Sequence, residues 1–324
     1  MNYLYKQIKE KMDSAEHILL LTDERIDGDT IGSTLGMFHI LQEMGKRATV
    51  FSPKELHGSL TFLPGTDEIG RDVGIFEDDS IDLVMIFDCS DGQYIEEKAY
   101  LPKMKKRAPL VVFDHHATNP NYGTINLIEE NAASTADVVW RFVKAVGLPM
   151  NKDAAQCILT GICTDTVVFS TANTNKACLD AAVELARYGA KLQEIVRHTM
   201  MNRSVEALKL WGLAFERLHH NDEFGATTTA ITRADMNAIG AGDEDFEGLS
   251  GFLYAMLEDS DTVLVLRETD DGGVKGSLRS KTRDVAALAA ERYGGGGHAA
   301  AAGFKVEGAT LEEKDGKWFV KKTQ

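Results

Sequence analysis

The chain has 324 residues, 44% of them hydrophobic, which is enough for one large or two ordinary domains with a sizeable core. Its 50 acidic and 35 basic residues give a formal net charge of −15, which argues against a long nucleic-acid duplex as partner because duplex binding depends on many phosphate contacts. Small anions held by metal ions remain compatible with this charge, because a bound dication outweighs distant surface carboxylates.

The cysteines and apolar runs indicate a cytoplasmic protein. None of the four cysteines belongs to a C-x-x-C pair, which favours buried reduced thiols over a disulfide framework or a zinc knuckle. The N-terminal segment is amphipathic and charged and lacks the apolar core of a secretory leader. No apolar run approaches the ~18 residues of a membrane span. We therefore expect a cytoplasmic location and no contact with a membrane.

The first half of the chain alternates short apolar runs with helical patterns, which predicts an α/β domain built on a doubly wound, mainly parallel sheet. Helices are expected over residues 2–16 and 30–44, and strands over residues 18–21, 47–52, 83–87 and 110–113. Gly32 and Ser33 lie near the expected start of the second helix, where their backbone amides would be offered to an anion.

Acidic and imidazole side chains follow three of these strands at the point where each strand ends. They are Asp23, Asp27 and Asp29 after the first strand, Asp88 after the third, and Asp114, His115 and His116 after the fourth. Open α/β sheets bind ligands at the carboxyl ends of their strands. A single Asp before a helix is commonly an N-cap, and two adjacent histidines are as often part of a solvated loop. The repetition at three strand ends favours a common site.

The middle of the chain is predicted to be helical. Helices are expected over residues 133–146, 153–162, 175–189 and 191–219. Asp165 follows the second of these and is a further candidate ligand, although an N-cap or a turn also explains it. The last stretch is long enough to include a connector between two domains.

The pattern changes from residue 226 onward, where a second, smaller α/β domain is expected. Strands are predicted over residues 226–232, 262–268 and 274–279, helices over residues 249–257 and 285–293, and a final hairpin around Asp315 and Gly316. A run of four glycines then leads to His298. Such a run is often a flexible loop, but Arg279, Ser280 and Lys281 nearby favour an anion-binding site.

The acidic and imidazole residues in these positions indicate a site for divalent metal ions. The candidate metal ligands are Asp23, Asp27, Asp29, Asp88, His115 and Asp165. A set rich in oxygen with few imidazoles suits Mn²⁺ or Mg²⁺ better than a thiolate-type zinc site. So many ligands exceed the needs of one ion but suit two ions that share a carboxylate, as in sites that hydrolyse phosphate esters. Carboxylates this dense would repel one another without cations, so hydrolysis of a phosphate ester is the leading prediction.

Five motifs, in order along nearly the whole chain, resemble the DHH phosphoesterases. They are Asp27-Gly28-Asp29 with Gly32-Ser33, Asp88-Cys89-Ser90, Asp114-His115-His116, Thr164-Asp165-Thr166, and the run Gly294, Gly295, Gly296, Gly297 and His298 followed by Ala301-Ala302-Gly303. The chain is most similar to the NrnA-type subfamily, which comprises oligoribonucleases, pAp phosphatases and relatives that act on cyclic dinucleotides.

The resemblance implies a role for each of these residues. Asp23, Asp27 and Asp88 would hold one divalent cation, and Asp29, Asp88, His115 and Asp165 the other, with Asp88 bridging. His116 would contact the scissile phosphate or protonate the leaving oxygen, and Asp114 would orient the two histidines. Arg279, Ser280 and His298 would bind the remote part of the substrate in a pocket shaped by Gly295, Gly296 and Gly297.

The resemblance also implies an architecture. Residues 1–190 would form the DHH catalytic domain, residues 191–218 a helical connector, and residues 219–324 the DHH-associated substrate-binding domain, with the active site in the cleft between the domains. A homodimer is expected from family habit.

The activity implied is that of a Mn²⁺-dependent phosphodiesterase, with Mg²⁺ or Co²⁺ as alternative ions. It would cut short single-stranded oligonucleotides (nanoRNA) or linear dinucleotides such as pApA to 5′-mononucleotides, together with pAp phosphatase activity. The alternatives are a cyclic-dinucleotide phosphodiesterase, a nucleotide-binding sensor with a weakened metal site, and a structural metal-binding protein.

Three positions depart from the family pattern. The family usually has His where this chain has Asp23 and Pro where it has Ile26, and the Asp at position 23 is expected to alter the preference for metal or the affinity. Val167 replaces the glycine that usually follows the Thr-Asp-Thr motif.

Overall fold

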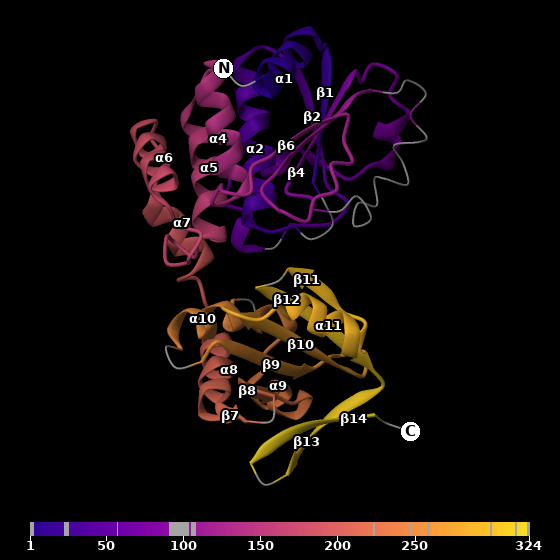
Figure 1. Cartoon of the computed structure of the whole chain (residues 1–324), viewed down its shortest axis with the longest axis vertical. Coiled ribbons are helices and arrows are strands. Elements are labelled where there is room, and N and C mark those ends of the chain that lie inside the picture. The colour runs from indigo at the N-terminus through magenta and orange to yellow at the C-terminus, as the bar shows by residue number, and fades with distance from the viewer. Residues whose placement is uncertain are drawn as a thin grey trace. The chain divides into compact units, whose positions relative to one another are not determined.

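The chain folds into two compact units, Met1–Asn202 and Arg203–Gln324 (Figure 1). The computed structural model describes residues 3–22, 26–56, 58–90, 104, 108–222, 224–246, 248–257, 260–298, 300–314 and 316–322. The division falls inside the expected connector at residues 191–218, and the roles assigned to the three segments stay predictions.

The first unit is built on a parallel sheet, as the sequence predicts, and this sheet has six strands. The strands are β1 (His17–Leu21), β2 (Arg47–Phe51), β3 (Ile69–Gly70), β4 (Leu83–Phe87), β5 (Leu110–Asp114) and β6 (Ile125–Ile128), in the order β3-β2-β1-β4-β5-β6. Every neighbouring pair is parallel. The order reverses between β1 and β4, and such a switch point is where open α/β sheets place their ligands.

Helices on one side and short segments on the other cover both faces of this sheet. The helices are α1 (Tyr3–Ser14), α2 (Gly28–Glu43), α4 (Thr135–Val146), α5 (Lys152–Asp165), α6 (Lys176–Arg187) and α7 (Leu192–Thr199). Ile18 and Leu20 of β1 join the larger apolar core, while Leu19 and Leu21 join a second core that includes Phe76 of the short helix Val73–Glu77. Successive strand residues point to opposite faces, so β1 is apolar throughout because both its faces are covered.

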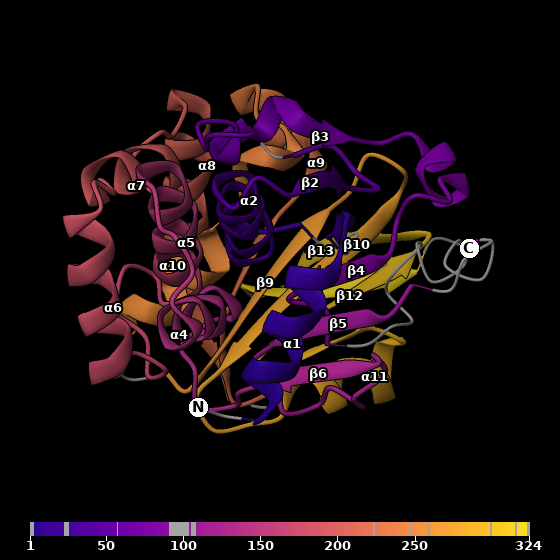
Figure 2. The same cartoon turned by 90° about the horizontal axis from the view of Figure 1, so that it is seen from above.

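Close packing of α2 on α5 holds the helical layer together, and the two helices lie side by side in both views (Figures 1 and 2). A Cβ at Gly32 would lie 2.6 Å from the Cys157 carbonyl oxygen, so only glycine fits this contact. The structure corrects the expectation that Gly32 offers its amide to an anion, because α2 already begins at Gly28 and Gly32 packs inside the helix.

The expected single helix over residues 191–219 is also wrong. α7 ends at Thr199, and α8 (Val205–Glu216) begins after Ser204, whose side chain accepts a hydrogen bond from the Ala207 amide as an N-cap. The short strands β3 and β6 have no counterpart among the predicted elements. Within the described ranges, none of the helices has the length and apolar character needed to cross a membrane.

The second unit contains a mixed six-stranded sheet in the order β11-β12-β10-β9-β8-β7. Its strands are β7 (His219–Asn221), β8 (Ala226–Ile231), β9 (Thr262–Glu268), β10 (Gly273–Ser280), β11 (Gly296–His298) and β12 (Ala301–Glu307), and β13 (Ala309–Lys314) and β14 (Lys317–Lys322) form a separate hairpin. α11 (Val285–Tyr293) contributes to the core on one face, and α8, α9 (Arg233–Ile239) and α10 (Leu249–Met256) to the core on the other.

The glycine run spans the end of α11 and the start of β11. Gly294 ends α11 with φ 66°, a left-handed conformation that favours glycine. A Cβ at Gly295 would lie 2.2 Å from the Gly303 carbonyl oxygen, and residues 296–298 then pair antiparallel with β12. The backbone that these glycines allow to approach closely is thus that of β12.

Candidate metal centre

Asp27 ends the loop that joins β1 to α2, Asp29 lies in the first turn of α2, and the two residues play different local roles. Asp27 is the N-cap of α2, with Oδ1 accepting hydrogen bonds from the Asp29 amide at 2.9 Å and the Thr30 amide at 3.0 Å. The capping explanation therefore holds for Asp27. Asp29 is only 2% exposed and lies against the first turn of α4.

The Asp29 carboxylate accepts one backbone hydrogen bond on each oxygen. The Thr135 amide donates to Oδ2 at 2.7 Å, and the Ala136 amide donates to Oδ1 at 2.9 Å. Burial, and next the charge of Asp27, raise the pKa of Asp29 to about 7 in spite of these bonds. Nearby positive charge would therefore favour the ionised form of Asp29 at neutral pH.

Asp88 follows β4 in a left-handed backbone conformation, with φ 57°. The Thr30 hydroxyl donates to its Oδ2 at 2.8 Å, and the Thr135 hydroxyl donates to its Oδ1 at 3.1 Å. Burial raises the pKa of Asp88 well above its ordinary value, and the charges of Asp29 and Asp27 add to the rise. This carboxylate lies in the middle of the acidic cluster.

Asp114 at the end of β5 is fully buried and binds His116. Its Oδ1 lies 2.7 Å from His116 Nδ1 and accepts hydrogen bonds from both histidine amides, at 2.8 Å from His115 and 3.2 Å from His116, while Asn119 donates to Oδ2 at 2.7 Å. Burial alone would raise the pKa of Asp114, but the hydrogen bond and charge of His116 hold it below the ordinary value. This is the geometry that an orienting role for Asp114 requires.

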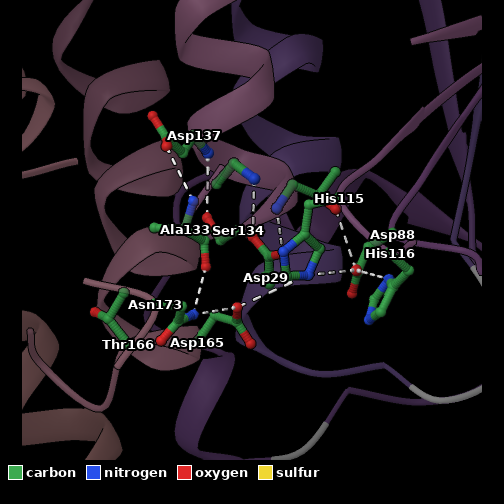
Figure 3. Close-up of polar contacts among 12 residues, drawn as sticks. Asp29, Asp88, His115, His116, Ala133, Ser134, Asp137, Asp165, Thr166 and Asn173 are labelled. Carbon is green, nitrogen blue, oxygen red and sulfur yellow. Dashed lines mark hydrogen bonds and ion pairs between the residues drawn. The ribbon is translucent and has the colours of Figure 1, made fainter. Parts of the chain in front are cut away.

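His115 lies between two of the acids. Its Nε2 is 4.0 Å from Asp88 Oδ1 and 3.8 Å from Asp165 Oδ2, and Figure 3 shows the ring with contacts to both. Burial, and next the charge of His116, lower the pKa of His115 to about 4. The ring is therefore neutral at neutral pH, which is the form that binds a metal ion.

Asp165 is the last residue of α5, and an unusual turn follows it. Val167, Val168 and Phe169 have φ values of 45°, 52° and 62°, a left-handed run that is costly for branched side chains. Asn173 donates to Asp165 Oδ2 at 3.4 Å and to the Ala133 carbonyl at 2.7 Å, which links Asp165 to the segment before α4. Burial, and next the charges of Asp29 and Asp27, raise the pKa of Asp165 well above its ordinary value.

Two groups of these side chains have the proximity that a metal ion needs. The groups are Asp88, His115 and His116, and Asp29, His115 and Asp165, each with ligand atoms within 4.8 Å of one another. Among the residues that the structure describes, Asp88 and Asp165 lie within 4.0 Å of ring nitrogens of the histidines, and neither forms an ion pair with lysine or arginine. Acids with raised pKa and imidazoles are a donor set that fits hard divalent cations. Asp23 lies outside the described residues.

Comparison with known proteins decides the family. Residues 17–162 match the model of the DHH family, N-terminal domain, and residues 240–317 match the DHHA1 domain. The bifunctional oligoribonuclease and PAP phosphatase NrnA of Thermus thermophilus is 31% identical over 299 residues, which cover 91% of this chain and 86% of that protein. The chain belongs to the DHH family. The resemblance predicted from the motifs is thereby confirmed.

Other relatives agree with this assignment. The NrnA protein of Bacillus subtilis is 27% identical, with 89% of each chain covered. The crystal structure of an exopolyphosphatase-related protein from Bacteroides fragilis superimposes with a TM-score of 0.86 at 24% identity, covering 94% of this chain and 91% of that one, and shows the same fold.

Three residues that support the candidate ligands of this DHH protein were not predicted from the sequence. They are Thr30, Thr135 and Asn173. The helix that begins near Thr135 is predictable, but the partner of its hydroxyl comes from a strand end 47 residues away. The position of Thr135 directly after the N-cap Ser134 is the one local signal, since helix N-termini attract carboxylates.

Arg279 and Ser280, two residues of the second unit that the sequence predicts to bind substrate, differ in their hydrogen bonds. Arg279 on β10 is half-buried and donates to the Leu278 carbonyl at 3.0 Å, without a carboxylate ion pair among the described residues. Burial lowers the pKa of Arg279. The Ser280 hydroxyl lies 3.0 Å from Thr262 Oγ1 and accepts from the Arg283 amide at 2.9 Å, so it stabilises the end of β10. Residues 279 and 298 both pair with Ala301 in the sheet.

Proposed function

We propose that this DHH protein is a metal-dependent hydrolase that cleaves short oligonucleotides, or linear dinucleotides such as pApA, to 5′-mononucleotides and also removes phosphate from pAp. The observation that carries the proposal is the convergence of Asp29, Asp88 and Asp165 on His115 at the switch point of the sheet. The names of the Thermus and Bacillus relatives support this choice of substrates.

Asp27, Asp29, Asp88, His115 and Asp165, with Asp23, are the residues that we expect to hold two divalent cations. Their oxygen-rich chemistry favours Mn²⁺, with Mg²⁺ and Co²⁺ as alternatives. Bound dications would activate water at neutral pH and neutralise charge on the phosphate. Asp88 is suited to serve both ions because its two oxygens face different donors, Thr30 and Thr135.

His116 is the residue that we expect to act on the scissile phosphate. With Nδ1 engaged by Asp114, Nε2 is the atom through which the ring would contact the phosphate or donate a proton to the leaving oxygen. The buried Asp114 stabilises the protonated ring and fixes its orientation, as a carboxylate partner does for other catalytic histidines.

The second unit would bind the remote part of the substrate. Arg279 supplies a cation without a carboxylate partner among the described residues, and His298 with Gly295, Gly296 and Gly297 lies on the neighbouring edge of the sheet. The hydrogen bonds of the Ser280 hydroxyl with Thr262 and the Arg283 amide favour a role in holding the end of β10 next to Arg279 over direct contact with the substrate. We also infer a cytoplasmic location from the four buried free cysteines, and a homodimer stays a prediction.

A substrate panel tests the function. The full chain is incubated with pAp, pApA, a five-nucleotide RNA and a cyclic dinucleotide in Mn²⁺, Mg²⁺, Co²⁺ or EDTA, and released mononucleotides are separated by chromatography. We expect turnover of the linear substrates with Mn²⁺, none in EDTA, and none with Asp88→Asn. Tight binding without turnover in every metal would indicate a sensor, and preference for the cyclic substrate would indicate a cyclic-dinucleotide phosphodiesterase.

A further inference from the structure

One face of β10 in the second unit carries basic residues at both ends. Alternate residues of a strand share a face, so Lys275, Ser277 and Arg279 lie together, while Val274 and Leu278 point into the apolar core on the other face. Lys275 is exposed, and Ser277 and Arg279 are half-buried.

Lys275 lies in a row of three cations. It pairs in register with Arg267 of β9 on one side and with Lys305 of β12 on the other. Figure 1 shows these three strands next to one another in the second unit. Like charges directly opposite one another on a sheet face destabilise it. A chain with a net charge of −15 thus keeps a locally unfavourable row of cations.

The two outer cations of this row, Arg267 and Lys305, have carboxylate partners, whereas the central Lys275 has none among the described residues. Arg267 lies 2.8 Å from Asp243, and Lys305 forms ion pairs with Asp271 and with Glu307, the latter at 2.8 Å. Those three carboxylates are 45%, 63% and 73% exposed, so each pair contributes only about 0–1 kcal/mol. Within the described part of the chain, Lys275 has no ion pair, and its pKa is lowered by the partial desolvation of its stem against neighbouring strands and then by the charge of Arg267.

The surface between Lys275 and Arg279 is lined by small residues and is partly exposed. Ser277 is flanked in register by Gly303 of β12, which pairs in turn with Gly296 of β11. These three residues are half-buried and lack bulky side chains. Lys275 and Arg279 are four residues apart, about 14 Å along a strand, which is too far for one phosphate to bind both.

We propose that Lys275, Ser277, Gly303 and Arg279 form a strip that binds single-stranded oligonucleotides through two separate phosphates, with Arg267 and Lys305 reinforcing the Lys275 end. This inference rests on the proposed function and narrows it, because pAp has one nucleoside and cannot lie along the whole strip. Oligonucleotides of three or more nucleotides are then the ligands that benefit from Lys275.

Binding without turnover tests the strip. Fluorescence anisotropy of a labelled five-nucleotide RNA is measured in EDTA with the wild-type chain, Lys275→Gln and Lys209→Gln. Lys209 is exposed on α8 of the same unit, so its variant removes the same charge at another place. We expect Lys275→Gln to weaken RNA binding about 10-fold, equivalent to about 1.4 kcal/mol, and to leave competition by pAp unchanged. Lys209→Gln should bind like the wild type.

The salt dependence gives a second readout. Loss of one phosphate contact with a single strand should lower the slope of log K against log salt by about 0.7. Removing a like charge should leave the thermal stability of Lys275→Gln equal to or above that of the wild type. An unchanged salt slope in Lys275→Gln would overturn the strip. So would a Lys275→Gln variant that loses as much affinity for pAp as for RNA, or a Lys209→Gln variant that loses as much RNA affinity as Lys275→Gln does.

The two proposals fail separately in this design. If the wild type hydrolyses RNA but Lys275→Gln neither weakens binding nor raises the KM for the five-nucleotide substrate, the strip is wrong and the function stands. If the wild type binds RNA with the predicted dependence on Lys275 but hydrolyses none of the panel, the strip stands and the proposed activity is wrong.

Discussion

The hydroxyl of Thr135 donates a hydrogen bond to Asp88 Oδ1 at 3.1 Å. The amide of the same residue donates to Asp29 Oδ2 at 2.7 Å, so the first turn of α4 holds two candidate ligands that arrive from different strands. A residue with both contacts fixes the separation of the two carboxylates. Thr135 is therefore a positioning residue for the candidate metal centre.

Replacing the Thr135 hydroxyl should weaken metal binding. Thr135→Val keeps the shape and the amide but loses the donor to Asp88, and loss of such supporting bonds typically costs about 10–100-fold in metal affinity. Thr135→Ser keeps the hydroxyl and should bind as the wild type does. Calorimetric titration with Mn²⁺ measures the difference. Thr160→Val is the control, because the Thr160 hydroxyl bonds the Gln156 carbonyl within α5; an equal loss in that variant would point to general destabilisation.

The stability of the metal-free protein should depend on the ionisation of Asp29. Its pKa in the folded chain is raised to about 7, against about 3.9 when unfolded, so its contribution is full below pH 4 and is lost as the pH rises through 7. His115, with its pKa lowered to about 4, gives the opposite slope, since its contribution is lost as the pH falls from about 6.5 towards 4.

Comparison with Asp29→Asn separates these slopes. In EDTA between pH 5 and pH 8, the melting temperature of the wild type should fall relative to that of Asp29→Asn, which cannot ionise at this position. Mn²⁺ should raise the wild-type melting temperature more at pH 8 than at pH 5, because the carboxylates need not lose protons first. Parallel profiles for the two proteins would contradict the assigned role of burial at Asp29.

The sequence predicted the candidate ligands at the strand ends better than it predicted the residues that hydrogen-bond to those ligands. Asp29, Asp88 and His115 are recognisable because each follows an apolar run, and a parallel sheet brings such ends to one edge. The bond from Asn173 to Asp165 depends on the left-handed turn between them, which no local pattern predicts for two valines. In the second unit, the strand after Gly295 was not predicted because glycines are rare in strands. Here they are needed because the backbone of this segment lies very close to β12.

Val167 should be a site where glycine stabilises the protein. Its φ of 45° costs a branched residue roughly 1–2 kcal/mol, while glycine loses about 0.5–1 kcal/mol through the entropy of the unfolded chain. Val167→Gly should therefore gain about 0.5–1 kcal/mol in urea unfolding. Val167→Ala keeps a Cβ and should gain less. A loss of stability in the glycine variant would show that the packing of Val167 outweighs its backbone strain.

Asp114→Asn should impair proton transfer more than metal binding. The wild-type carboxylate accepts from His116 Nδ1 at 2.7 Å and stabilises the protonated ring, whereas an amide carries no charge to do so. We expect kcat to fall on the order of 10²–10⁴-fold, the usual contribution of general acid–base catalysis, and the alkaline limb of its pH profile, where a general acid loses its proton, to shift to lower pH. Calorimetry should give a Mn²⁺ affinity within a few-fold of the wild type. Asn119→Ala, which removes the other side-chain donor to Asp114 but leaves the charge of Asp114, should change kcat less. An unshifted pH profile in Asp114→Asn would remove His116 from the proton-transfer step.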